Sequence, residues 1–118
     1  MKRNERIIVI IPALNEEGKI GTVVSRIKQE ASLLTDEILV VDDGSKDNTR
    51  EEAKNNGANV ISYTRNRGAG TAIRTGIDYA IKHKYDIAVI MGGDNQDNPK
   101  EMNRLLYPIL HDHFDFVQ

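Results

Sequence analysis

The sequence predicts an α/β protein with an open, mostly parallel sheet and helices on both faces. Short apolar runs rich in β-branched residues alternate along the chain with segments whose apolar residues repeat at helical spacing. These runs lack the polar alternation of half-exposed strands, which is typical of strands that helices cover on both sides. Right-handed crossovers connect such an alternating order into a parallel sheet, so both observations favour the same fold class.

The first two strands are predicted at residues 7–11 and 38–41. The segment between them has four apolar residues at positions i, i+3, i+4 and i+7, the pattern of an amphipathic helix. These residues are Ile20, Val23, Val24 and Ile27.

A weaker helical pattern runs over residues 48–56. Asp47 or Asn48 suits its start, because a side-chain oxygen there can accept a backbone N–H. Gly57 suits its end, because glycine adopts the left-handed backbone that closes many helices. The third strand is predicted at residues 60–63.

The second half of the chain predicts a helix, a strand at residues 87–91, and a further helix. The first of these helices has the stripe Ile73, Ile77, Ala80 and Ile81, and the second has Met102, Leu105, Leu106, Ile109 and Leu110. Pro108 is expected to kink or end the second one. Residues 114–117 suit the start of a fifth strand, and we therefore expect the chain to be part of a longer protein.

Length and composition predict one domain over residues 1–118, because 118 residues suit a single hydrophobic core. The 16 basic and 18 acidic side chains give a net charge of −2, so nucleic acid and anionic membranes are not expected as main partners. The absence of cysteine excludes disulfides and thiolate metal sites. No apolar run is long enough to span a bilayer and no signal peptide is evident, so we expect a cytoplasmic location.

Four polar or glycine-rich segments follow the four predicted strands. They are PALNEE at 12–17, DDGS at 42–45, TRNRGAG at 64–70 and GGDNQD at 92–97. Ligands of open parallel sheets bind outside the carboxyl ends of the strands. Because the four segments meet at that edge, we predict one binding site there.

Single residues in these segments also have purely structural interpretations. Asn15 and Glu16 suit caps of the first helix. Asp42 and Asp43 suit a turn, but two adjacent carboxylates repel each other and need a compensating partner at a buried strand end. This need favours a functional role for the acidic pair.

The segment after the third strand combines arginine with glycine. Arg67 is either a solvated loop charge or a ligand contact. Gly68 and Gly70 let the backbone approach a ligand at a helix N-terminus, where amides and the helix dipole attract phosphate. The segment is not the dinucleotide-binding fingerprint, since Ile73 stands at the position of its third glycine. With the carboxylates, it suits a phosphorylated ligand and a hard cation such as Mg²⁺ or Mn²⁺.

Four longer stretches occur in the order and spacing of the family 2 inverting glycosyltransferases with the GT-A fold, which the sequence resembles over about residues 6–118. They are VIIPALNEEGKI, EILVVDDGSKDNT, RNRGAGTAIRTGIDYA and MGGDNQDNP. The likeness is strongest to the polyprenol-phosphate branch, similar to dolichyl-phosphate mannose synthase. It implies a Rossmann-like domain that binds a nucleotide-diphospho-sugar and forms the N-terminal part of a longer enzyme.

The resemblance implies inverting transfer of a sugar from a UDP- or GDP-sugar to an acceptor, either polyprenyl phosphate or a saccharide. It assigns nucleotide contacts to these residues: Pro12, Ala13, Asn15, Glu16, Asp42, Asp43, Arg67, Gly68, Gly70, Gly93 and Asp94. Either Asp42 or Asp43 would accept the N–H of the base, uracil or guanine. Arg67 and the glycine segment after it would face the diphosphate or ribose.

Asp94 matches the last aspartate of the family's D-x-D metal motif, and Gln96 matches the glutamine that follows it on the diphosphate side. The first aspartate of the motif is Gly92 here. We therefore expect weaker binding of Mg²⁺ or Mn²⁺, held by Asp94, donor phosphates and water. Asp97 is either a compensating carboxylate or a cap of the fourth helix.

The resemblance places the general base, an aspartate or glutamate, beyond Gln118. Inversion needs such a base when the acceptor is a hydroxyl, and less so when it is an anionic phosphate. We expect the 118-residue chain to bind donor better than it turns it over. Any membrane attachment of the full-length protein is also expected beyond Gln118.

Two alternatives belong to other classes. The stretch ILVVDDGS resembles the acidic pair of a two-component receiver domain, with Asp94 as phosphoacceptor. Receivers, however, usually carry that pair on the first strand and need a later Lys and Thr or Ser. The other alternative is a nucleotidyltransferase-like or catalytically silent nucleotide-binding module. The loop after the first strand lacks the glycine-rich, basic phosphate grip that a nucleotidyltransferase needs.

Overall fold

The structure is a computed structural model that describes residues 5–31, 34–92 and 106–108. From β1 to β4, strands and helices alternate in it as the sequence predicts. The elements are β1 (Ile7–Ala13), α1 (Ile20–Glu30), β2 (Glu37–Asp42), α2 (Thr49–Asn55), β3 (Asn59–Ser62), α3 (Ala69–Lys82), β4 (Ile87–Ile90) and β5 (Leu106–Pro108).

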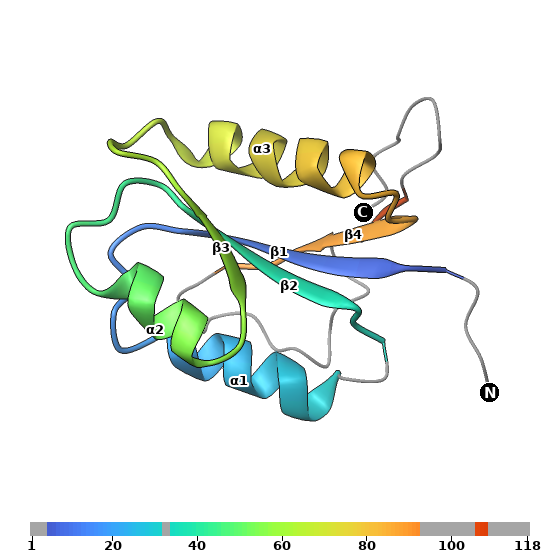
Figure 1. Ribbon diagram of the computed structural model, residues 1–118, viewed down its shortest axis with the longest axis horizontal. Helices are drawn as coiled ribbons and strands as arrows, with labels where there is room; N and C mark the ends of the chain where they lie inside the picture. Colours follow the sequence, from blue (N-terminus) through green and yellow to red (C-terminus); the bar gives the residue numbers. More distant parts are fainter. Residues whose placement is uncertain (1–4, 32–33, 93–105, 109–118) are drawn as a thin grey trace.

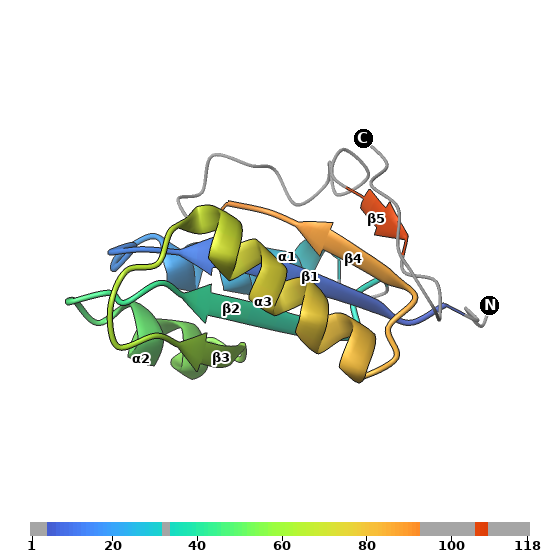
Figure 2. The ribbon, with the colours of Figure 1, turned by 90° about the horizontal axis from the view of Figure 1, so that it is seen from above.

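The strands form one sheet in the order β3-β2-β1-β4-β5. Pairing is parallel from β3 to β4, and β5 runs antiparallel to β4 at the edge. Helices α1 and α2 cover one face and α3 covers the other (Figures 1 and 2). The predicted open, mostly parallel sheet with helices on both faces is confirmed.

Each face of the sheet has its own core. Side chains of β1 alternate between the cores, so Val9 and Ile11 face α1 and α2, whereas Ile8 and Ile10 face α3. The predicted stripe of α1 is buried throughout. On the other face Gly76 lets α3 approach the sheet closely, because a Cβ there would overlap the side chain of Ile10.

The edge strand β3 corrects one part of the prediction. We expected all four predicted strands to be buried on both faces, but Asn59 and Ser62 are exposed and Val60 and Ile61 are only half-buried. The reason is position, because β3 pairs with β2 alone and so lies at the rim of both cores.

The fourth predicted helix is wrong where the structure describes it. Residues 106–108 form β5, whose Leu106 pairs with Val89 of β4. Apolar spacing suited a helix, but Pro108 lacks the N–H of a helix interior and is tolerated at an edge strand. The remaining residues of that stripe, and the fifth strand predicted at 114–117, lie outside the described residues.

Within residues 5–31 and 34–92, no helix has both the length and the apolar character needed to cross a membrane.

Candidate functional site

Three of the four predicted loops meet at the carboxyl-terminal edge of the sheet. The loops after β1, β2 and β3 lie together on the left-hand side of Figure 1. The fourth loop begins after Met91, and its predicted ligands Gly93, Asp94 and Gln96 lie outside the described residues. The prediction of converging loops is therefore confirmed for three strands.

This edge is also where the order of the strands reverses. The chain moves outward from β1 to β2 and β3, and then returns to place β4 on the other side of β1. Ligands of open α/β sheets bind in the crevice outside such a switch point. Pro12 and Ala13, which end the central strand β1, therefore stand at the favoured position.

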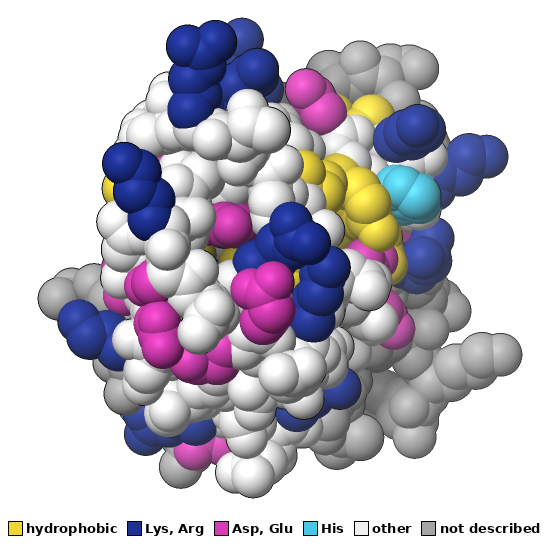
Figure 3. Space-filling view, turned by 60° about the vertical axis from the view of Figure 1, so that its left-hand side comes forward, with side chains coloured by type: hydrophobic (Ala, Val, Ile, Leu, Met, Phe, Trp, Pro, Cys, Tyr) yellow, Lys and Arg dark blue, Asp and Glu magenta, His cyan; other side chains and the backbone are white. Residues whose placement is uncertain are grey.

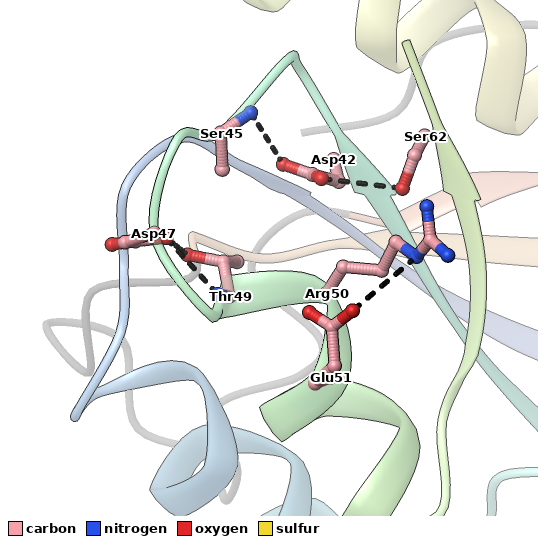
Figure 4. A network of polar contacts seen from close by, with 7 residues as sticks. All are labelled: Asp42, Ser45, Asp47, Thr49, Arg50, Glu51 and Ser62. Atoms are coloured by element: carbon pink, nitrogen blue, oxygen red, sulfur yellow. Dashed lines mark hydrogen bonds and ion pairs between the residues drawn. The ribbon is translucent and has the colours of Figure 1, made fainter. Parts of the chain in front are cut away.

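Asp42 is the last residue of β2 and only 4 % exposed. Its Oδ1 accepts the N–H of Ser45 at 3.0 Å, and its Oδ2 accepts the hydroxyl of Ser62 at 3.2 Å (Figure 4). The first bond closes the turn after β2, and the second ties that turn to the end of β3.

Asp43, also 4 % exposed, connects three strand ends. Its backbone N–H donates to the carbonyl of Ala13 at 2.9 Å. Its carboxylate accepts the N–H of Arg67 at 2.7 Å and that of Gly68 at 3.0 Å. The compensating partners expected for the acidic pair are therefore present, and they are backbone amides and a hydroxyl.

Glycine is required at two places in these loops. Gly44 has φ +81°, and a Cβ there would lie 2.5 Å from the backbone carbonyl carbon of Arg65. Gly68 begins α3 with φ +100° and ψ 153°, a region that side chains rarely allow. Gly70 follows in the first turn of α3 and faces open space.

Arg67 is exposed, and its guanidinium lies 5.0 Å from the ring centre of Tyr63. The Tyr63 hydroxyl contacts the carbonyl of Thr71 at 3.3 Å and the hydroxyl of Thr75, both on α3. Tyr63 thus supports the predicted phosphate contact, Arg67, by a cation–π interaction.

The expected side-chain caps of α1 by Asn15 and Glu16 are wrong, because the cap residue is Lys19. Helix α1 begins at Ile20, and its cap residue Lys19 makes no side-chain hydrogen bond there. The amides of Lys19 and Ile20 donate to the backbone carbonyl of Glu16 at 3.0 and 2.9 Å. Glu52 of α2 accepts the N–H of Gly18 at 2.8 Å and that of Gly21 at 2.6 Å. A carboxylate at a helix N-terminus also interacts favourably with the helix dipole.

Asn15 and Glu16 instead contact the β2–α2 loop. Asn15 has φ +52°, donates its N–H to the Ser45 hydroxyl at 2.9 Å and accepts the Lys46 N–H on its side-chain oxygen at 3.0 Å. Glu16 donates its N–H to the Thr49 hydroxyl at 2.8 Å. The first two strand-end loops are therefore held together.

Sequence reasoning missed the roles of Thr49 and, in part, of Asp47. Asp47 precedes the cap residue Asn48 and accepts the N–H and the hydroxyl of Thr49. Partial burial raises the pKa of Asp47, but hydrogen bonds from Thr49 and from the Glu17 backbone outweigh it and lower the pKa overall. The available signal was a Ser, Asp and Thr in alternate positions after an acidic strand end. The end of α2 agrees with prediction, since Gly57 closes it at φ +100°.

Charges of both signs lie on this side of the molecule. Figure 3 turns it forward and shows Asp and Glu side chains among Lys and Arg side chains. Carboxylates can accept an N–H, while arginine and the amides at the start of α3 can bind phosphate oxygens. The arrangement therefore suits a ligand that carries both groups.

The described residues do not by themselves form a metal site. No group of three or more His, Cys, Asp or Glu side chains converges within residues 5–31 and 34–92. Gly92 supplies no side-chain oxygen, and the carboxylates of Asp42 and Asp43 accept protein hydrogen bonds. A cation at this edge would therefore need donors from the segment after Gly92.

Comparison with known families and proteins gives one consistent result. The model of the family described as glycosyl transferase family 2 matches residues 8–118. A UDP-N-acetylglucosamine–dolichyl-phosphate N-acetylglucosaminyltransferase of Methanococcus voltae is 36% identical over 94% of this chain and 50% of its own length. A polyprenol monophosphomannose synthase of Mycolicibacterium smegmatis is 32% identical over 90% of this chain and 42% of its own.

Solved structures agree with this result. Glucosyl-3-phosphoglycerate synthase from Mycobacterium tuberculosis, in complex with Mn²⁺, UDP and glucosyl-3-phosphoglycerate, superposes with a TM-score of 0.71 at 31% identity, over 86% of this chain and 38% of that one. Another structure of that enzyme contains Mg²⁺ and UDP. The chain spans about half the length of the curated relatives it matches, 50% and 42% for the two named above.

Proposed function

The chain belongs to glycosyl transferase family 2, and from this premise we propose that it binds a UDP- or GDP-sugar at the carboxyl-terminal edge of its sheet. The whole protein transfers the sugar to polyprenyl phosphate with inversion. The observation that carries the proposal is the junction of three strand-end loops at the switch point, with Asp43 bonded to the amides that open α3.

In this proposal each loop recognises a different part of the donor. The acidic pair after β2 accepts the N–H of the base, since each carboxylate oxygen has a second lone pair beyond its protein hydrogen bond. Pro12, Ala13, Asn15 and Glu16 line the nucleotide pocket beside it. Arg67 and the glycine segment after it face the diphosphate or ribose, with the guanidinium of Arg67 and the amide of Gly70 as donors. The amide of Gly68 donates to Asp43 and so fixes the path of this segment.

A divalent cation, Mg²⁺ or Mn²⁺, is proposed to bind with the diphosphate through Asp94, with Gly93 and Gln96 on the same side. Support comes from the Mn²⁺ and Mg²⁺ found with UDP in structures of the related synthase. Such a cation supplies charge neutralisation on the leaving diphosphate. Because Gly92 provides no carboxylate, we expect the cation to bind more weakly here than at a complete D-x-D motif.

The proposed acceptor is a phosphate oxygen, as the names of the dolichyl-phosphate and polyprenol relatives suggest. In the reaction the acceptor oxygen forms a bond to the anomeric carbon, while the bond from that carbon to the diphosphate breaks and UDP or GDP leaves. A general base is needed only if the acceptor is a hydroxyl, and we place it beyond Gln118. A saccharide acceptor remains the alternative. Such a polyprenyl acceptor would bring the whole protein to the cytoplasmic face of a membrane, and that location stays a prediction.

The receiver-domain alternative is not favoured. The strand order β3-β2-β1-β4 differs from the flavodoxin-like order 2-1-3-4-5 of receivers. The acidic pair follows the second strand, and the family match lends this alternative no support.

The test is calorimetric titration of the 118-residue chain with UDP and with GDP, each with and without Mn²⁺. We expect one nucleotide to bind, with an affinity that Mn²⁺ strengthens by about tenfold, as expected for one additional charge-assisted contact. Asp94→Ala should abolish this metal effect. Asp78→Ala is the matched control, because it removes the same charge from an exposed position on α3.

Binding of neither nucleotide would contradict the donor site. Labelling of Asp94 by acetyl phosphate would support the receiver alternative in its place. Nucleotide binding without sugar transfer by the full-length protein, tested with a polyprenyl phosphate and with saccharide acceptors, would identify a silent module.

A further inference from the structure

The β1–α1 loop is hydrogen-bonded to the β2–α2 loop and to the start of α2. Asn15 exchanges two hydrogen bonds with Ser45 and Lys46 at one end, and Gly18 donates to Glu52 at the other. All of these contacts join residues at least 30 positions apart in the sequence. The two loops therefore form one unit at the edge of the sheet.

Asp47 and Thr49 form the centre of this unit. The Thr49 hydroxyl accepts the N–H of Glu16 at 2.8 Å and donates its own proton to Oδ1 of Asp47. Oδ2 of Asp47 accepts the N–H of Glu17 at 3.2 Å, and Oδ1 also accepts the Thr49 N–H at 3.0 Å. Figure 4 shows Asp47 and Thr49 bonded to each other beside the ribbon of the β1–α1 loop. Two consecutive amides of that loop are thus held by one pair of side chains.

Because Thr49 is buried, replacing its hydroxyl leaves a hydrogen-bond partner unsatisfied. Thr49 is 0 % exposed, and the other buried polar or charged side chains among the described residues are Asp42 and Asp43 at the same edge. A valine has the same shape but offers no acceptor, so the Glu16 N–H would lose its partner in a water-poor environment. A serine would keep the hydroxyl and lose one methyl group.

We propose that Asp47 and Thr49 act as a latch that positions the β1–α1 loop for nucleotide binding. This inference rests on the donor site proposed above. The latch acts through the backbone of Glu16 and Glu17, so Asp47 and Thr49 are positioning residues. The conformation it holds includes the left-handed backbone of Asn15, which an unrestrained loop populates less.

The apolar contacts that anchor the two helices to the sheet do not involve Asp47 or Thr49. Helix α1 is anchored by its buried apolar stripe, and α2 by Ala53 in the same core. Loss of the latch should therefore loosen the loop more than it destabilises the domain. If the two residues position the loop, their loss should reduce nucleotide affinity more than the loss of stability explains. A purely structural role would not have this effect.

The experiment compares Thr49→Val, Thr49→Ser and Asp47→Asn with the parent chain. Calorimetry with UDP and with GDP in the presence of Mn²⁺ gives the affinity, and NMR gives the hydrogen exchange of the Glu16 and Glu17 amides. Ala53→Gly is the matched control, because it weakens the same helix without changing a side-chain hydrogen bond. Thermal unfolding of every variant measures stability.

We expect Thr49→Val to weaken nucleotide binding by about tenfold and to speed exchange of the Glu16 amide, as loss of one buried hydrogen bond predicts. The nucleotide affinity of Thr49→Ser should stay within about twofold of the parent's, since serine retains the hydroxyl. Asp47→Asn should speed exchange of the Glu17 amide and weaken binding, which keeps the test valid if Thr49→Val does not fold. Ala53→Gly should lower the unfolding temperature and leave affinity unchanged.

Parent-like affinity in Thr49→Val and Asp47→Asn would overturn the latch while leaving the donor site intact. Equal losses of affinity in Ala53→Gly and Thr49→Val would also overturn it, because stability alone would then explain both. If the parent chain binds neither nucleotide, the proposed function fails first, and the positioning role fails with it.

Discussion

Two carboxylates at opposite edges of the sheet, Asp43 and Glu37, each accept several hydrogen bonds, but from different kinds of donor. At the carboxyl-terminal edge Asp43 accepts two backbone N–H groups, from Arg67 and Gly68. At the opposite edge Glu37 accepts side-chain donors, the hydroxyl of Tyr79 at 2.6 Å among them. Backbone donors fix the path of a loop, whereas side-chain donors join elements that are already folded. The contacts of Asp43 therefore set the loops of the candidate site, whereas those of Glu37 join elements of the fold.

Glu37, at the start of β2, accepts hydrogen bonds from three side chains. Besides Tyr79, this carboxylate accepts the Tyr85 hydroxyl and the side-chain amide of Asn59 at 2.7 Å. Burial raises the pKa of Glu37, but the three hydrogen bonds and the charge of His83 outweigh it, so the pKa lies below its ordinary value. The same contact raises the pKa of Tyr79 to about 12.

The largest effect is expected for Asp43→Asn. Asparagine offers one oxygen and one NH₂ where two amides donate, so one amide loses its acceptor and meets another donor. We expect a loss of about 3 kcal/mol in the free energy of unfolding, because both the charge and a buried hydrogen bond are lost. Urea denaturation measures this loss, and calorimetry should show weaker nucleotide binding as well. A nucleotide affinity equal to that of the parent would contradict the distinction between Asp43 and Glu37.

A smaller effect is expected for Glu37→Gln. The amide oxygen of the glutamine can still accept one hydrogen bond from a hydroxyl. We therefore expect a loss of about 2 kcal/mol in unfolding free energy and no change in nucleotide affinity. The pH dependence sharpens this prediction. Because the pKa of Glu37 is lowered on folding, its contribution is present above the ordinary value of 4.5 and is lost as pH falls through the folded value. The variant should therefore lose less stability than the parent on acidification, and an identical acid profile would contradict the prediction.

The smallest effect is expected for Tyr79→Phe, which removes one half-buried hydroxyl. We expect a loss of about 1 kcal/mol near neutral pH, the usual contribution of one hydrogen bond. Since the pKa of Tyr79 is raised from 10 to about 12, its contribution is present below pH 10 and is lost as pH rises toward 12. The difference between parent and variant should therefore shrink over that interval in denaturation curves measured at each pH. A constant difference would show that the hydroxyl does not titrate as proposed.

Much of the fold was predictable from local patterns. The buried stripe of α1 and the end of α2 at Gly57 followed from spacing and from glycine. Prediction failed where position in the sheet decided the outcome, as for the half-exposed β3 and for residues 106–108, which pair with β4. It failed again for the side chains of Asn15 and Glu16, because the side-chain acceptor near the start of α1 is Glu52 of α2.

By itself, the sequence determined the alternation of strands and helices, the edge at which polar loops gather, and the family. These depend on periodicity, turn residues and motifs that lie within a few positions of one another. Only the tertiary structure decided which carboxylate accepts a hydrogen bond from which backbone amide. Asp43 and Arg67 are 24 positions apart and Gly18 and Glu52 are 34 apart, and they meet because parallel crossovers bring successive strand ends to one edge. Hydrogen bonds between side chains and the backbone of distant loops follow no sequence period, so partners at such separations are set by the packed sheet.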